Sequence, residues 1–332
     1  MQFLERRRVL STAAAAAFGL AVPAGCATET ANAGRSGATG NRRSLDSPVR
    51  VEHRFGSTTV DAVPRRVVSL DLQWTDTMLA LGTEPVGYGR DRRMPKSGVP
   101  WQRLSSATAF RMDDGVPVEE ILRLRPDLIV GTFSIPDAET YRLLSDIAPT
   151  IASLDSRQVS PWRQLVGLAG KLLDRRAKAR QVVRSVESEV RRTAEDLPGL
   201  RGQTFLLAQY LVGDGMYLVS DPQDGSSVLF RQLGMKLYPP VARQGERTGQ
   251  PRVQVNPERS DLLRSDLLAF LINGGDRRDL ADIAGFDRLP GTVAVLDYAT
   301  VVGLNTPSAL SLPYALAELR PYLERAAANR PR

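Results

Sequence analysis

Residues 116–132, VPVEEILRLRPDLIVGT, carry the pattern that decides the fold. The first part predicts a helix over residues 118–126, which proline ends just before Asp127. The apolar run DLIVGTF follows at once and predicts a buried strand. A helix that leads directly into a buried strand is typical of a βαβ unit, so this stretch predicts an α/β fold with a parallel sheet.

The same alternation of strand and helix extends in both directions along the chain. Apolar runs predict strands at residues 65–72, 84–89, 127–133 and 150–154, and again at 204–212, 216–221, 267–273 and 292–298. The strands at 204–212 and 216–221 are close enough to form a hairpin. Between the two blocks, an amphipathic run predicts one helix about 35 Å long. The expected domains are an N-terminal lobe at 45–173, a bridging helix at 174–198 and a C-terminal lobe at 199–332.

The two lobes repeat a short pattern. Aligning Asp127 on Asp266 places Glu119 on Glu258, each eight residues before its aspartate at the start of a predicted helix. A helix that feeds a parallel strand begins at the carboxyl edge of the sheet, where ligands bind in open α/β folds. Both glutamates should therefore flank the mouth of a cleft between the lobes. The alternative is that carboxylates simply favour helix N-termini.

The N-terminus has the order of a secretory signal peptide, with a basic head, an apolar run and small residues before Cys26. Residues 1–25 are the expected signal peptide, and residues 26–44 a flexible tether. The string AGC resembles a bacterial lipobox, which predicts lipidation of Cys26; ERRRVLS also resembles a twin-arginine export signal. The alternative is an alanine-rich helix with a buried cysteine. Cys26 is the single cysteine, so the mature domain offers no thiol for catalysis or metal binding.

Composition excludes several classes of function. The net charge is +7, but basic residues alternate with acids and form no stripe with aromatic residues, so nucleic-acid binding is not expected. The single histidine, His53, precedes the first predicted strand and is expected at the surface. We therefore expect no bare metal site and no cofactor. No G-x-S-x-G, G-x-G-x-x-G or phosphate loop is present, which argues against an enzyme.

At this point the chain resembles the substrate-binding lipoproteins of ABC importers for ferric siderophores, haem and cobalamin, known as class III periplasmic binding proteins. The resemblance rests on the segments RRVVSLDLQWTDTMLALGTEPVGYG, VPVEEILRLRPDLIVGT, LLSDIAPTIAS and LPGTVAVLDYATVVGLNTPSALSLPYALAELRPYL. It implies two Rossmann-like lobes with parallel sheets, bridged by a single rigid helix, with the ligand cleft between them. It also implies that Glu119 and Glu258 dock onto the ABC permease and ATPase complex. The expected protein is a monomer anchored to the outer face of the cell membrane.

The residues that follow the strand ends should line the cleft. They are Trp74, Arg90, Arg92, Arg93, Trp101, Phe133, Tyr210, Tyr217, Arg231, Tyr238 and Arg243. Arginine and aromatic side chains suit a large anionic aromatic chelate, through charge-assisted hydrogen bonds and stacking. The predicted ligand is a ferric siderophore, with iron bound only within it. The alternatives are haem or cobalamin on the same fold, or a noncatalytic scaffold of the cell envelope.

Overall fold

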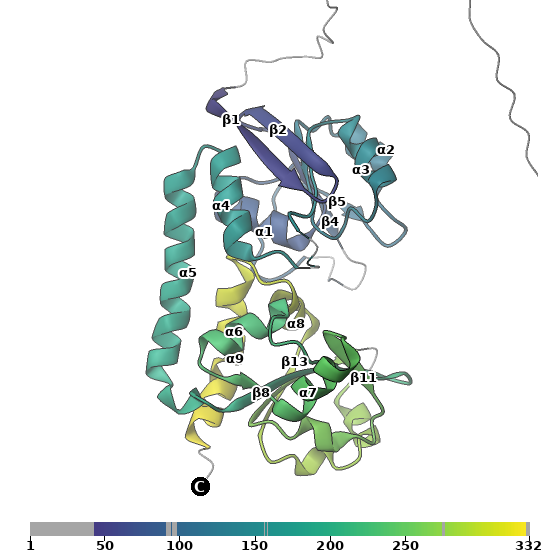
Figure 1. The fold of residues 1–332 in the computed structure, drawn as a ribbon, viewed down its shortest axis with the longest axis vertical. Helices are drawn as coiled ribbons and strands as arrows, with labels where there is room; N and C mark the ends of the chain where they lie inside the picture. The colour runs from purple at the N-terminus through teal and green to yellow at the C-terminus, as the bar shows by residue number, and fades with distance from the viewer. Residues whose placement is uncertain are drawn as a thin grey trace, which may run out of the picture. The chain divides into compact units, whose positions relative to one another are not determined.

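Two α/β halves joined by one long helix, α5 (Arg176–Asp196), make up the protein in a computed structural model (Figure 1). The structure describes residues 43–90, 94, 98–155, 157, 159–273 and 276–329. Helix α5 lies within the predicted range of 174–198. Its buried positions, Ala179, Val186, Val190 and Thr193, fall on one face and explain why a helix so rich in charge is held against the protein.

The first half contains a five-stranded parallel sheet in the order β5-β4-β3-β6-β7. Its strands are β3 (Val67–Ser69), β4 (Gly87–Arg90), β5 (Thr108–Arg111), β6 (Leu128–Val130) and β7 (Thr150–Ile151). Its helices are α1 (Leu72–Ala80), α2 (Val118–Arg123), α3 (Ala138–Ser145) and α4 (Trp162–Leu172). Strands β3 and β6 are buried at every position, which accounts for their uninterrupted apolar sequence.

An antiparallel hairpin, β1 (Ser44–His53) and β2 (Gly56–Ala62), precedes this sheet and was not expected. The predicted tether was to end at residue 44, which is the first residue of β1. The expected surface position of His53 is wrong: the hairpin turn buries it to 8% exposure. Alternating buried residues in both strands pack one face of the hairpin on the core, and this alternation is the sequence signal for it.

The second half contains a six-stranded sheet with the main order β11-β9-β8-β12-β13, and β10 also pairs with β8. Its strands are β8 (Thr204–Leu211), β9 (Gly215–Val219), β10 (Lys236–Leu237), β11 (Arg252–Val255), β12 (Leu267–Asn273) and β13 (Thr292–Leu296). The α/β fold is confirmed, but the expectation of two parallel sheets is wrong here, because β9 is antiparallel to both neighbours. The predicted hairpin is the cause, since the short turn after Leu211 reverses the chain.

Helices cover this second sheet, and short 3₁₀ turns fill the connections. The helices are α6 (Val228–Gln232), α7 (Pro239–Thr248), α8 (Tyr298–Asn305) and α9 (Ser311–Ala328). The 3₁₀ turns are η1 (Pro198–Leu200), η2 (Gly225–Ser227), η3 (Ser260–Leu263), η4 (Arg277–Asp282) and η5 (Phe286–Arg288). Residues 41–332 form one compact unit with its own core. Within the described ranges, no helix is both long enough and apolar enough to cross a bilayer.

The aspartates of the sequence repeat make equivalent hydrogen bonds in the two halves. Asp127, before β6, accepts the backbone N–H of Arg66 at 2.8 Å, where β3 begins. Asp266, before β12, accepts the backbone N–H of Thr204 at 2.6 Å and its hydroxyl at 2.7 Å, where β8 begins. Each carboxylate therefore fixes the amino end of the neighbouring central strand, and the repeat seen in the sequence is a repeat in structure.

We expect Asp266→Ala to lower the free energy of unfolding by about 1–3 kcal/mol, because it strips Thr204 of its acceptor at a partly buried strand end. Urea denaturation measures the change. Asp287→Ala is the control, because the Asp287 side chain is 85% exposed, and it should change stability by less than about 0.5 kcal/mol. Equal stability of the two variants would contradict the role given to Asp266.

Candidate functional site

The carboxyl edge of the first sheet is organised by a buried carboxylate, Asp71, which follows β3. It caps α1 by accepting the backbone N–H of Trp74 at 3.0 Å. It also accepts the backbone N–H of Thr132 at 2.5 Å and the hydroxyls of Thr132 and Ser134 at 2.9 and 3.3 Å. Burial raises the pKa of Asp71, and these hydrogen bonds oppose the rise. One carboxylate thus joins the loops after β3 and β6.

Phe133 lies between the two residues that Asp71 holds, and its side chain is 46% exposed. A ring this exposed contributes little to the core. Its two neighbours in the chain are both held by Asp71, Thr132 through its backbone N–H and hydroxyl and Ser134 through its hydroxyl. The arrangement presents a fixed aromatic surface at the carboxyl edge, where the sequence predicted a ligand contact.

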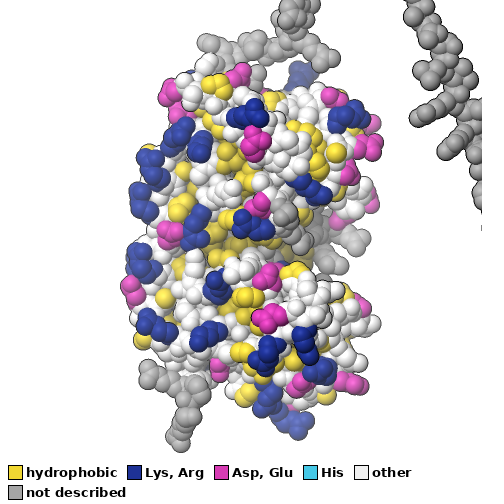
Figure 2. All heavy atoms as spheres, in the orientation of Figure 1, with side chains coloured by type: hydrophobic (Ala, Val, Ile, Leu, Met, Phe, Trp, Pro, Cys, Tyr) yellow, Lys and Arg dark blue, Asp and Glu magenta, His cyan; other side chains and the backbone are white. Residues whose placement is uncertain are grey.

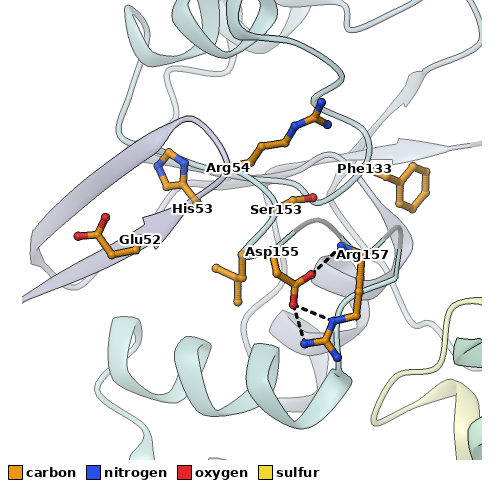
Figure 3. Close-up of a pocket in the computed structure, with 8 residues that line it drawn as sticks. Glu52, His53, Arg54, Phe133, Ser153, Asp155 and Arg157 are labelled. Atoms are coloured by element: carbon orange, nitrogen blue, oxygen red, sulfur yellow. Dashed lines mark hydrogen bonds and ion pairs between the residues drawn. The ribbon is translucent and has the colours of Figure 1, made fainter. Parts of the chain in front are cut away.

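Phe133 borders a pocket of about 610 Å³. The pocket is lined by the hairpin turn and by the loops after β6 and β7, with Glu52, His53, Arg54, Phe133, Ser153, Leu154, Asp155 and Arg157 (Figure 3). Figure 3 shows Arg157 folded back onto Asp155, and the guanidinium Nε lies 2.9 Å from the carboxylate. The volume falls in the usual range for small-molecule sites.

His53 borders this pocket as a buried, hydrogen-bonded ring. Its Nε2 lies 2.9 Å from the hydroxyl of Thr58 and 3.4 Å from that of Tyr141. Burial lowers the pKa of His53, and the nearby Glu52 opposes this only in part. Among the described residues, no three His, Cys, Asp or Glu side chains are grouped so that they could hold a metal ion.

A second polar cluster joins the two halves directly. Asp76 of α1, fully buried, accepts the indole N–H of Trp101 at 2.9 Å and the amide of Gln102 at 2.5 Å. It also accepts the hydroxyl of Ser308, which lies between α8 and α9 of the second half. Burial raises the pKa of Asp76 to about 6, although all three hydrogen bonds act against the rise. We call Asp76, Trp101, Gln102 and Ser308 the junction.

Two further contacts reinforce the junction. The Trp101 ring packs on Tyr314 of α9 with centroids 5.0 Å apart, and a Cβ on Gly303 would lie 3.0 Å from the same indole. The amide of Gln73 donates to the backbone carbonyls of Ser160 and Pro307 at 3.0 and 2.8 Å. Trp101, predicted as a ligand contact, therefore has a structural task between the halves.

The other predicted ligand residues of the first half divide three ways. Trp74 has no exposed surface and packs in the main core, so the structure contradicts a direct ligand contact for it. The helix that starts after Asp71 turns the indole inward. Arg90 ends β4 and is partly buried at the carboxyl edge, as expected. Arg92 and Arg93 lie outside the described residues.

In the second half the predicted residues do not form one group. Tyr210, at the end of β8, is buried, and its hydroxyl lies 3.3 Å from Asp282. Tyr217 donates to Asp214 at 2.9 Å, and Tyr238 is the half-buried residue before α7. These three tyrosines have polar partners or core contacts of their own.

Arg231 is placed away from the carboxyl edge. It is exposed on α6 and donates to the backbone carbonyl of Pro222, in the loop after β9. Because β9 is antiparallel to β8, that loop lies towards the amino end of β8, opposite Tyr210. Arg243 is exposed on α7, and neither arginine lines the 610 Å³ pocket.

Sequence reasoning missed most of the pocket wall. Glu52, Arg54, Leu154 and Arg157 were not among the predicted ligand residues, yet all border the cavity. The signal for Glu52 and Arg54 was the alternation of residues 44–62, which predicts a hairpin if it is read on its own. The position of Arg157 depends on its contact with Asp155, a local pairing that the sequence also contained.

The two predicted docking glutamates are both at the surface. Glu119 lies in the first turn of α2, with a side chain 90% exposed and 3.5 Å from Arg123. Glu258 is exposed in the loop before η3, so the helix expected there is only a 3₁₀ turn. Neither side chain has a role in the core that would explain its charge, and their part in docking stays a prediction.

Two α/β halves, one linking helix and a pocket at the carboxyl edge of a sheet define a solute-binding protein of the two-lobed class. The sequence profile of the family described as "Periplasmic binding protein" matches residues 67–260, and the chain belongs to this family. The family resemblance inferred from the sequence is confirmed.

Relatives of known name support the same assignment. The chain is 26% identical over 192 residues to a probable siderophore-binding lipoprotein, YfiY, of Bacillus subtilis, covering 56% of each chain. It is 34% identical over 145 residues to the Fe(3+)-citrate-binding protein YfmC of the same organism, covering 42% of each. These alignments span about half the length of the relatives or less.

Solved structures agree over a longer part of the chain. A periplasmic solute-binding protein of Mycobacterium smegmatis superposes with a TM-score of 0.70 and 27% identity, over 85% of this chain and 99% of that one. PiaA of Streptococcus pneumoniae in complex with ferrichrome gives a TM-score of 0.68 at 22% identity, over 85% and 100%. The latter likeness is one of fold.

Proposed function

We propose that this protein is an exported lipoprotein that captures a ferric siderophore and delivers it to an ABC permease for iron uptake. Membership of the binding-protein family, together with the 610 Å³ pocket at the carboxyl edge, carries the proposal. The relatives named for siderophore and ferric citrate binding support the same ligand class. Cys26, outside the described residues, is the proposed lipid anchor, and the protein carries out no chemistry on its ligand.

The lining of the pocket favours a wrapped metal over a bare one. Arg54 brings a guanidinium group to the wall, Arg157 brings a second one that is paired with Asp155, and Phe133 adds an exposed ring. These groups suit the anionic oxygens and flat rings of a chelate. We propose that iron arrives already bound within its siderophore.

A titration of residues 41–332 tests this function. Ferric catecholate, hydroxamate and citrate chelates, haem, cobalamin and bare ferric iron are added in turn, and quenching of tryptophan fluorescence is measured. We expect saturable quenching by one class of ferric siderophore and none by bare iron. Saturable binding of haem or cobalamin alone would show that the ligand is not a siderophore but that compound. If none of these compounds quenches the fluorescence, the result would favour a scaffold protein.

We expect Phe133→Ala to weaken siderophore binding about tenfold, which corresponds to roughly 1.4 kcal/mol. The change removes an exposed ring and leaves the hydrogen bonds from the Thr132 backbone N–H and the Ser134 hydroxyl to Asp71 intact. Leu143→Ala, on α3 and 38% exposed, is the control and should leave affinity unchanged. If the two variants bind the siderophore with equal affinity, Phe133 is not part of the binding site.

A further inference from the structure

A groove between α4 and α5 carries a charge that neither the fold nor the proposed ligand explains. It has a volume of about 360 Å³ and is lined by Arg163, Gly167, Lys171, Arg176, Ala179, Arg180, Val183 and Arg184. Its floor is made of small and apolar residues, because the two helices approach closely: a Cβ on Gly170 would lie 2.5 Å from that of Ala179. Figure 2 shows Lys and Arg side chains gathered over α5, at the left of the view.

Helical spacing places the cations in two facing rows. Arg176, Arg180 and Arg184 recur every four residues and share one face of α5. Arg163 and Lys171 stand eight residues apart on α4 and form the opposite rim. The groove therefore has an apolar floor between two rows of cationic side chains, one on each helix.

The positive charge of these rims is mostly uncompensated. Arg163 pairs with Glu187. The remaining four, Lys171, Arg176, Arg180 and Arg184, are exposed, and within the described part of the chain none of them makes an ion pair. We call these four residues the cationic rim.

The cationic rim works against the stability of the isolated protein. Like charges four residues apart on a helix repel each other, and cations in the first turn oppose the helix dipole. Helix α5 nevertheless begins with Arg176 and has no acidic residue in its first turn. Neither the core nor the 610 Å³ pocket uses these residues. An external anion would offset this repulsion.

The place where the chain enters the described structure indicates which anion would bind the cationic rim. Arg43, the first described residue after Cys26, makes an ion pair with Asp174 in the turn between α4 and α5. The part of the chain that carries Cys26 therefore joins the described structure at this end of the groove. The phosphate groups of anionic lipids would be attracted to the cationic rim, and the apolar floor would accept the adjoining acyl carbons.

We propose that the α4–α5 groove binds the anionic phospholipid surface, so that the free receptor rests on the membrane along α5. The proposal builds on the lipid anchor of the proposed function, but it concerns a different face from the 610 Å³ pocket. The contribution of each cation near such a surface corresponds to about a fivefold change in binding. Loss of the cationic rim should therefore weaken binding at least about a hundredfold.

Vesicle sedimentation tests the proposal with residues 41–332, which form a compact unit and lack Cys26. Vesicles of phosphatidylcholine are compared with vesicles that also contain phosphatidylglycerol, at low and high ionic strength. We expect binding only to the anionic vesicles, weakening as salt rises. Binding to both kinds of vesicle, or to neither, would overturn the proposal, whereas siderophore titration of the same protein reports separately on the proposed function.

Two quadruple variants separate the groove from net charge. In the first, Lys171, Arg176, Arg180 and Arg184 are each changed to Gln. In the control, four exposed arginines of the second half, Arg201, Arg243, Arg247 and Arg264, are changed to Gln. We expect the groove variant to lose binding at least about a hundredfold and the control less than about threefold. If both variants lose binding equally, net charge and not the groove would account for the effect. Thermal unfolding verifies that both variants fold.

A fluorescent label reports which face meets the membrane. The tested protein has no cysteine, so Gly167→Cys creates a single thiol inside the groove, where an added Cβ meets nothing within 4 Å. Leu143→Cys on α3 is the control. An environment-sensitive dye at position 167, and not at 143, should shift to the blue on phosphatidylglycerol vesicles. A shift at 143 alone, or at neither site, would contradict the groove as the contact. A matching blue shift of the position-167 dye with soluble glycerol phosphate would make the site one for free phosphate.

Discussion

Asp76→Ala is expected to lower the free energy of unfolding by about 3–5 kcal/mol, because three donors of the junction lose a buried acceptor at once. The donors come from both halves, so the variant should also lose one direct polar link between them, while the hydrogen bond from Gln73 to Pro307 remains. Urea denaturation at neutral pH measures the loss. The effect should exceed that of any exposed carboxylate several-fold.

Ser308→Ala and the double variant show whether the junction acts as a unit. Ser308→Ala leaves Asp76 with Trp101 and Gln102 and should be milder than Asp76→Ala. If the two residues depend on each other across the halves, the double variant should differ from the sum of the singles by about 1 kcal/mol or more. Additive effects would show that the contact carries no coupling.

The junction also predicts how stability depends on pH. The pKa of Asp76 is raised from 3.8 to about 6. Between these values the folded protein keeps a proton that the unfolded chain has lost, so stability is highest below pH about 4 and falls as the pH rises through about 6. The fall attributable to Asp76 is on the order of 3 kcal/mol. Asp76→Asn should flatten this slope, and an unchanged slope would refute the assignment.

The second large effect concerns delivery of the ligand. Charge reversal at both predicted docking residues, Glu119→Arg with Glu258→Arg, should reduce siderophore-dependent iron uptake at least about tenfold, because it replaces attraction to permease cations with repulsion. Siderophore affinity and stability should not change, since both side chains are exposed and outside the pocket. Uptake of labelled iron and a titration of the same variant separate the two properties.

Glu120→Arg is the matched control for docking. Glu120 is the neighbour of Glu119 in the first turn of α2 and is also exposed. Normal uptake by Glu120→Arg, together with failure of the double variant, would assign docking to the repeated pair. Normal transport by the double variant would instead leave Glu119 and Glu258 as ordinary surface charges.

Local patterns predicted the fold where one element determines the next. The run at residues 116–132 becomes α2 and β6, and the amphipathic run at 174–198 becomes α5, because each has one buried face or a fully buried strand. The hairpin β1–β2 was missed because its buried positions are few and include the polar His53 and Thr58, so its alternation is weaker than the apolar runs of the sheet strands. The antiparallel β9 followed from a hairpin that the sequence did predict.

The site was harder to predict because it depends on direction and on long-range contact. Trp74 follows a strand end, as a ligand residue would, yet the capped start of α1 points its ring into the core. Asp76 and Ser308 are separated by most of the chain, so no local pattern brings them together. The place of Phe133 at the carboxyl edge follows from β6, which directly precedes it, whereas the hydrogen bonds of its neighbours Thr132 and Ser134 with Asp71 join two loops and could not be predicted.

Helix α5 and the junction both connect the halves of this protein. Together they restrict how far one half can rotate against the other. If the protein captures a chelate as proposed, binding should work mainly through side chains that adjust around it, since wide closing of the halves would break the buried hydrogen bonds of Asp76. On the same proposal, release would depend on contact with the permease, and the protein alone should release its ligand slowly.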